Sequence, residues 1–189
     1  LMGNVPVSIT LETKNDRQEK ALRAMENAFD EARRIEREVS EWRPESQTSL
    51  LNRNAGKKWV PIGRNLMEIL IMAQKASEIT DGAFDITFAS KEGVCWKDII
   101  LIPELSLASL TSPQAKIGLS GIAKGYIVDQ MSAVLRRKGF RKHLINAGDI
   151  YASGRWEVAI RDPEGPPDQV ICHVTLNHQA ISTSTASSP

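Results

Sequence analysis

The sequence predicts an α+β protein with a largely antiparallel sheet and packed helices. Two observations favour this class. Three segments with helical periodicity lie before residue 140, whereas four strand-like segments follow one another from residue 143 onward. Strands that are grouped together favour an antiparallel sheet over the regular strand–helix alternation of a doubly wound α/β fold.

The three helices are predicted from apolar residues at three- and four-residue spacing. They cover about residues 17–40, about residues 65–79, and the stretch between Gly125 and Gly139. Asp81-Gly82 is a typical end for the second helix, because glycine readily adopts a positive φ. The first helix is expected to bury one face, made of Leu22, Met25, Phe29, Ala32, Ile35 and Val39.

Alternating or continuous apolar runs predict the strands. One strand is expected at residues 5–11 and a short one at 59–62. Residues 43–46 are expected to break the first helix, and residues 52–58 to form a polar loop around Gly56. Residues 87–116 give no clear pattern beyond two short apolar runs. The four late strands are expected at residues 143–146, 154–161, 169–176 and 179–182.

Composition excludes several classes of protein. The 189 residues include 24 Lys and Arg against 23 Asp and Glu, a net charge of +1 that argues against a nucleic-acid binder acting through a broad basic surface. No apolar run reaches the roughly 18 to 20 residues that span a bilayer. The two cysteines and three histidines form no metal-binding motif.

A first candidate site follows the second helix, at Gly82-Ala83-Phe84-Asp85-Ile86-Thr87. The small residues would let a ligand approach the backbone, Phe84 offers a flat surface, and Asp85 offers a hydrogen-bond acceptor. A helix cap followed by a buried Phe would explain the same residues without a ligand.

A second candidate site is the glycine-rich stretch 118–129, which places Lys124 at the start of the third helix. Amides at a helix N-terminus carry partial positive charge, so a phosphate or pyrophosphate would suit this position. The stretch is not a P-loop, and a plain loop-to-helix junction is the alternative. A third stretch, 146–150, puts Asp149 near a sheet edge, and a hairpin turn explains it nearly as well.

Taken in order, these stretches resemble those of the ApbE family of flavin transferases. The resemblance covers essentially the whole chain, and its two central elements are the most specific. The matching elements are Met2-Gly3; Trp42 to Ser46 with Ser49 and Asn52; Gly82 to Thr87; Gly121 to Asp129; and Trp156 to Pro163.

The resemblance implies an ApbE-like, T-fold-related architecture that binds FAD with Mg²⁺ near the pyrophosphate. The activity it implies is transfer of FMN from FAD to a Thr of a target flavoprotein with release of AMP, or hydrolysis of FAD to FMN and AMP. It assigns no catalytic residue, and it assigns the Mg²⁺ ligand to the backbone carbonyl of Gly121. The residues it implies for FAD binding are Met2, Trp42, Ser46, Ala83, Phe84, Asp85, Lys124 and Asp129.

Residues 1–189 are accordingly expected to form a single ApbE-like domain without the family's C-terminal portion. In the family that portion carries a His near the reacting phosphate and an Asp and a Thr of the metal site. Two interpretations therefore stay open: an active transferase or pyrophosphatase, and a non-catalytic remnant that binds flavin or a partner protein. The resemblance implies a periplasmic or membrane-anchored location, while the lack of a signal or lipobox in the sequence leaves a cytoplasmic one open.

Overall fold

The computed structural model describes residues 5–163, 165–166 and 169–183, which form two compact units. The four-strand unit contains the chain up to Ala32 together with the chain from Val128 onward. The three-strand unit runs from Arg33 to Ile127. Helices and antiparallel sheets build both units, which confirms the predicted α+β class. The expected single domain over residues 1–189 stays a prediction.

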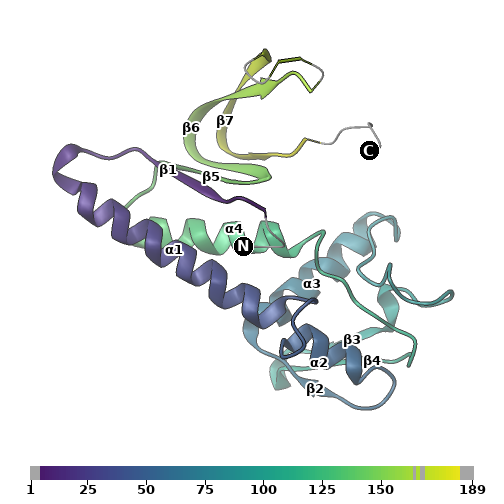
Figure 1. Ribbon diagram of the computed structural model, residues 1–189. Coiled ribbons are helices and arrows are strands. Elements are labelled where there is room, and N and C mark those ends of the chain that lie inside the picture. Colours follow the sequence, from purple (N-terminus) through teal and green to yellow (C-terminus); the bar gives the residue numbers. More distant parts are fainter. Residues whose placement is uncertain (1–4, 164, 167–168, 184–189) are drawn as a thin grey trace. The chain divides into compact units, whose positions relative to one another are not determined.

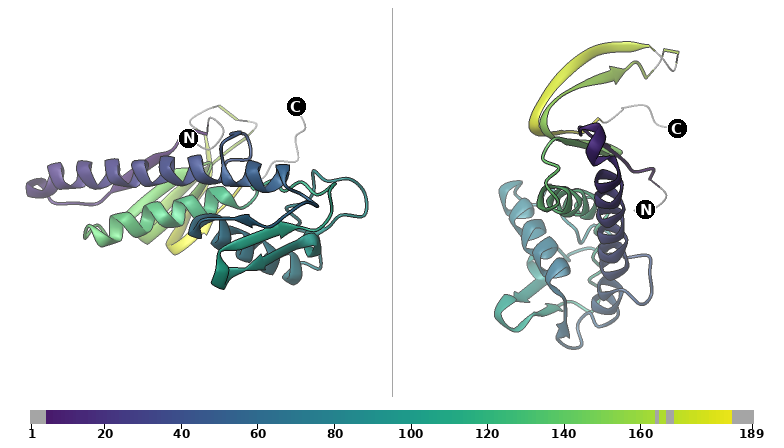
Figure 2. Two further views of the ribbon diagram at one scale, coloured as in Figure 1. Left: turned by 90° about the horizontal axis from the view of Figure 1, so that it is seen from below. Right: turned by 90° about the vertical axis from the view of Figure 1, so that its left-hand side faces the viewer.

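The sheet of the four-strand unit has the order β1-β5-β6-β7, and every neighbouring pair is antiparallel (Figure 1). Helices α1 and α4 each run from one unit into the other, and their parts in this unit lie on one side of the sheet (Figures 1 and 2). A short 3-10 helix, Asn15–Arg17, precedes α1. The bounds are β1 Ser8–Leu11, α1 Gln18–Val39, α4 Ala123–Arg137, β5 His143–Ala147, β6 Asp149–Arg161 and β7 Val170–Ile181.

The last two predicted strands are one continuous strand, so the break expected between residues 176 and 179 was wrong. Ala152 pairs with Gln179 and Arg155 pairs with Asn177, which leaves two residues of β6 opposite the single residue His178. Gly154 and His178 both adopt positive φ there, at 83° and 53°. The polar Asn-His pair therefore marks a β-bulge, which bends the ladder without ending it.

The predicted buried face of α1 is right for its second half and wrong at its start. Ala32, Ile35 and Val39 are buried as expected, but Leu22 is 60% exposed. The buried positions before Ala32 are instead three alanines, Ala21, Ala24 and Ala28. Adjacent helix positions point about 100° apart. Small side chains let a helix backbone pack closely, so alanines can form the buried face while a neighbouring leucine faces solvent.

The three-strand unit combines a small antiparallel sheet, ordered β2-β4-β3, with helices α2 and α3 (Figure 1). Helix α2 lies mostly on residues 47–51, for which no element was predicted, and reaches into the polar loop expected at residues 52–58. Strands β3 and β4 occupy the region without a clear pattern. Two short 3-10 helices, Trp96–Asp98 and Pro103–Leu105, flank β3. The bounds are α2 Gln47–Arg53, β2 Val60–Pro61, α3 Arg64–Ile79, β3 Ile99–Ile102 and β4 Leu107–Leu110.

The core of the three-strand unit is aliphatic. Its fully buried side chains come from both helices, from the small sheet and from the extended segment before α4. They include Leu51, Leu66, Ile69, Leu70, Ile99, Leu110, Ile117 and Leu119. In the part of the chain that the structure describes, none of the helices is both long enough and apolar enough to cross a membrane.

A buried histidine joins α4 to the sheet within the four-strand unit. His143 on β5 lies 2.8 Å through Nε2 from the Ser132 hydroxyl and 2.9 Å through Nδ1 from the Phe140 carbonyl. Assigning the ring proton to Nδ1 lets it donate to Phe140 and accept from Ser132. Burial is the main cause that lowers the pKa of His143.

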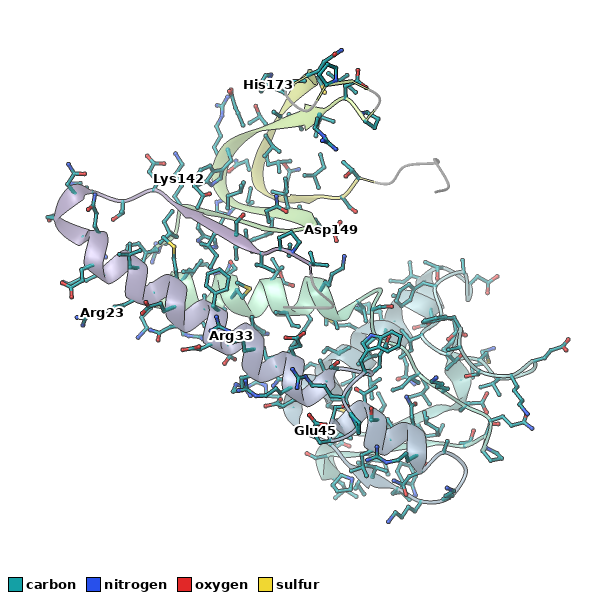
Figure 3. All side chains as sticks on the ribbon, in the orientation of Figure 1. Arg23, Arg33, Glu45, Lys142, Asp149 and His173 are labelled. Atoms are coloured by element: carbon teal, nitrogen blue, oxygen red, sulfur yellow. The ribbon has the colours of Figure 1, made fainter. Side chains whose placement is uncertain are left out.

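We expect His143 to make the fold less stable in acid. His143 binds a second ring proton more tightly in the unfolded chain than in the folded one. The contribution of neutral His143 to stability is therefore present above the ordinary His pKa of about 6.5 and is lost as the pH falls below it. Urea denaturation at several pH values measures the slope of the free energy of unfolding against pH. His143→Gln should flatten it, whereas His173→Gln, an exposed position on β7 (Figure 3), should not. An unchanged slope in His143→Gln would contradict the assignment.

Candidate functional site

Three segments that lie far apart in the sequence meet within the three-strand unit. They are the turn after α1 at residues 41–42, the turn after α3 at residues 82–88, and residues 117–122 before α4, here called the glycine segment. The Gly118 amide donates to the Ile86 carbonyl at 2.8 Å, and the Leu119 amide donates to the Glu41 carboxylate. The two predicted ligand-binding stretches of this unit are thus in direct contact.

The turn after α3 begins with a well-formed helix cap. The Gly82 amide donates to the Ser77 carbonyl at 2.8 Å, and the Asp81 amide donates to the Glu78 carbonyl at 3.2 Å. This is a Schellman arrangement, in which Asp81 itself adopts the left-handed conformation with φ 50° and Gly82 follows with φ 82°. The predicted helix end is confirmed: Gly82 adopts the expected positive φ, and Asp81 before it does so as well.

Asp85 shapes this turn through both of its carboxylate oxygens. Oδ1 accepts from the amide and the hydroxyl of Thr87, each at 2.7 Å, and Oδ2 accepts from the Trp96 amide at 3.0 Å. The aspartate therefore joins the turn to the 3-10 helix before β3. Its predicted contact with FAD stays a prediction, as does that of the exposed Ala83 beside it.

Aromatic rings lie against two glycines of the glycine segment. A Cβ placed on Gly121 would lie 3.3 Å from Cε2 of Phe84, and one placed on Gly118 would lie 2.8 Å from Cε1 of Phe88. Phe84 is half-buried and Phe88 is 67% exposed. The alternative of a helix cap followed by a buried Phe is thus right in part, because the cap forms and Phe84 packs against Gly121 but is only half-buried.

The turn after α1 contributes one predicted and one unpredicted residue. Trp42, predicted to line the flavin site, is 80% exposed, so its ring is accessible to a ligand. Glu41 was not predicted from the sequence as a site residue, although its carboxylate accepts a hydrogen bond from the Leu119 amide. No local pattern could have revealed Glu41, because the contact joins residues 78 positions apart. Its position next to Trp42 was the only signal.

Three polar residues that follow Trp42 form hydrogen bonds within the protein. Ser46 is buried and caps α2, and its Oγ accepts from the Ser49 amide at 3.0 Å. The Ser49 hydroxyl donates to the Glu41 carbonyl at 3.3 Å. Asn52 forms a double contact with the backbone of Ile117, accepting from its amide at 2.9 Å and donating to its carbonyl at 3.0 Å. Ser46, predicted to contact FAD, thus has its hydroxyl engaged inside the protein.

Lys124 is the second residue of α4, which confirms that a lysine stands at the start of this helix. A Cβ on the neighbouring Gly125 would meet no atom within 4 Å, so the backbone of this first turn is open. Tyr126 anchors the turn to α3, because its hydroxyl lies 2.9 Å from Asn65 Oδ1 and 2.8 Å from Glu68 Oε2. Burial and the hydrogen bond to Glu68 raise the pKa of Tyr126 above its usual range.

The remaining predicted residues belong to the four-strand unit or lie outside the described residues. Asp129 belongs to the four-strand unit, where desolvation raises the pKa of its carboxyl and Arg136 partly offsets the shift, although the residue is exposed as a whole. Met2 lies outside the described residues. The stretch 146–150 is the turn between β5 and β6, with Gly148 at φ 90°, so the hairpin interpretation holds. Asp149, also in the four-strand unit (Figure 3), accepts from the Ser182 hydroxyl at 2.5 Å.

The comparison with known families agrees with these elements. The model of the ApbE family matches residues 2–92 and 89–187, almost the whole chain. The chain belongs to the ApbE family. Among its relatives, a FAD:protein FMN transferase of Klebsiella pneumoniae is 26% identical over 167 residues, which cover 75% of this chain and 52% of that protein. A FAD:protein FMN transferase of Haemophilus influenzae is 23% identical over 186 residues, covering 79% and 54%.

Solved ApbE structures share the fold. The ApbE protein of Thermotoga maritima superposes with a TM-score of 0.76 at 22% identity, covering 93% of this chain and 65% of its own. The flavinyl transferase ApbE of Pseudomonas stutzeri gives a TM-score of 0.74 at 18% identity, covering 94% and 64%. The chain spans about half the length of the curated ApbE relatives it matches.

The contacts of the ApbE glycine segment give a direct stability test. Asn52→Ala should lower the free energy of unfolding by about 2 kcal/mol, because it leaves the buried Ile117 amide without its partner. Lys58→Ala, at an exposed position of the same unit, should change it by less than about 0.5 kcal/mol. Denaturant unfolding measures both values. Equal stabilities for the two variants would show that the Asn52 contact contributes nothing.

Proposed function

We propose that this chain binds FAD and transfers its FMN half to a threonine of a target flavoprotein, with release of AMP. The observation that carries the proposal is the meeting of three segments in one unit: the turn with the exposed Trp42, the turn with Phe84, and the glycine segment that leads to Lys124. The relatives named FAD:protein FMN transferase support the reaction type.

The residues present fit a flavin dinucleotide. Trp42 exposes an aromatic surface of the kind on which an isoalloxazine or adenine ring stacks. The open backbone at Gly125 lets a ligand approach the first turn of α4 closely. The partial positive charge of that helix start and the ammonium of Lys124 both complement phosphate. The exposed indole thus suits a ring system, and the start of α4 suits a pyrophosphate.

Magnesium fits less completely. Among the residues that the structure describes, no group of three or more His, Cys, Asp or Glu side chains could hold a metal ion. Mg²⁺ often takes few protein ligands and completes its shell with water and substrate phosphates. The proposed dependence on Mg²⁺ therefore rests on family resemblance, with the Gly121 carbonyl as the one ligand from this segment.

The proposed transfer is a substitution at phosphorus. A bond forms between the threonine oxygen and the phosphorus of the FMN half, the bond from that phosphorus to the AMP oxygen breaks, and the hydroxyl proton passes to water. Lys124 and the amides at the start of α4 would stabilise the negative charge that develops on the pyrophosphate. In the alternative reaction, hydrolysis of FAD, water replaces the threonine and the products are FMN and AMP.

The flavin site is tested first by the exposed indole. Trp42→Ala should raise the dissociation constant for FAD about tenfold, because stacking on an aromatic ring contributes roughly 1–3 kcal/mol per base. Trp42→Phe should recover most of the loss. Trp59→Ala, an indole 43% exposed on the same unit, is the matched control and should bind like the unchanged protein. Titration followed by flavin fluorescence gives the constants. A Trp42→Ala variant that binds FAD normally would remove Trp42 from the site.

The reaction is tested by incubating the protein with FAD, Mg²⁺ and a target flavoprotein, with mass spectrometry of the target and quantification of AMP. Transfer should add FMN to one threonine and release an equal amount of AMP. Lys124→Ala should reduce the rate roughly a hundredfold, as expected when a charge-stabilising group is lost. Formation of FMN and AMP without labelling of the target would favour hydrolysis of FAD over transfer. FAD binding without either product would favour the non-catalytic interpretation, and no binding would overturn the proposal.

A further inference from the structure

We propose that Glu41 is a positioning residue of the flavin site, which holds the glycine segment and the start of α4 in the form that receives the dinucleotide phosphates. This inference rests on the proposed FAD binding. It concerns a residue next to the predicted ring-binding Trp42 whose carboxylate contacts the glycine segment, which leads to the predicted phosphate-binding start of α4.

The contact itself is specific. Oε2 of Glu41 accepts a hydrogen bond from the amide of Leu119, a residue that is 2% exposed. The same oxygen lies 3.1 Å from the place where a Cβ on Gly118 would stand. Glycine at this position therefore admits the carboxylate, and the carboxylate satisfies a backbone donor that would be costly to leave unpaired in the interior.

The position of Leu119 in turn determines how α4 begins. Its carbonyl accepts from the amide of Ile122 at 3.0 Å and from the amide of Ala123 at 2.8 Å. These two hydrogen bonds close the turn that immediately precedes Lys124. A change in the position of Leu119 would therefore change how the helix begins and where the first-turn amides point.

Glu41 is itself held in place. The Ser49 hydroxyl donates to its carbonyl, and Ser46 in turn accepts from the Ser49 amide as the cap of α2. Neighbouring parts of the glycine segment are fixed by uncharged groups, Asn52 at Ile117 and the Phe84 ring at Gly121. Among these contacts of the described residues with the glycine segment, the one made by Glu41 involves a charged group. A hydrogen bond to a carboxylate is stronger than one between neutral groups.

The experiment compares variants at position 41 with one matched control. Glu41→Ala removes the acceptor. Glu41→Gln keeps its length and an acceptor oxygen, and Glu41→Asp keeps the charge but is one methylene shorter. The control is Glu45→Ala, an exposed glutamate in the same loop (Figure 3) whose partner is Arg43 at 3.6 Å. Two quantities are measured: amide hydrogen exchange of residues 117–123 without flavin, and the dissociation constant for FAD by fluorescence titration.

The expected result has a clear order. Glu41→Ala should increase exchange over residues 117–123 and raise the dissociation constant for FAD roughly tenfold, because it leaves the buried Leu119 amide without its acceptor. Glu41→Asp should resemble it, whereas Glu41→Gln should stay within about threefold of the unchanged protein. The control should change neither quantity. If Glu41→Ala does not fold, the contrast between the Gln and Asp variants gives the same test.

The following results would overturn the proposal. Faster exchange with unchanged FAD affinity would make Glu41 a purely structural residue. A normal Asp variant beside a defective Gln variant would show that charge matters and position does not. No FAD binding by the unchanged protein would reject the proposed function together with this inference, whereas normal FAD binding by Glu41→Ala would reject this inference alone.

Discussion

The double contact between the Asn52 side chain and the backbone of Ile117 is the interaction on which the candidate site depends. The glycine segment belongs to neither sheet, so its backbone donors and acceptors need partners from elsewhere. Asn52 supplies two of them, Glu41 supplies a third, and the Ile86 carbonyl supplies a fourth. Residues near the end of α1 and in α2 thus impose the shape of a segment that lies about 70 positions further along the chain.

This arrangement separates the family motif residues into two groups. Ser46, Asn52, Asp85 and Tyr126 direct their polar atoms to other parts of the protein. Trp42 is exposed, and the helix start at Lys124 lies beside open backbone. A motif that is specific for a ligand-binding family can therefore consist mostly of residues that build the frame, with few that are accessible to the ligand.

The sequence predicted the features that depend on local pattern. Three helices followed from periodicity, and the lysine at the start of α4 followed from its place among glycines. Helix α2 was missed because it is only seven residues long and depends on its Ser46 cap. The alanine face of α1 was missed because alanine is compatible with both exposed and buried positions. Glu41 was missed because its role comes from a contact across the fold, which no local spacing encodes.

The open backbone at Gly125 has a thermodynamic counterpart. A glycine inside a helix is less favourable than alanine by roughly 0.5–1 kcal/mol, so the first turn of α4 is intrinsically weak. The hydrogen bonds of Tyr126 one residue later tie that turn to α3 and offset the weakness. Glycine at this position lowers the helix propensity of the first turn, but a bulkier residue would fill the open space beside its backbone. Tertiary contacts thus maintain a helical turn that the local sequence alone would not.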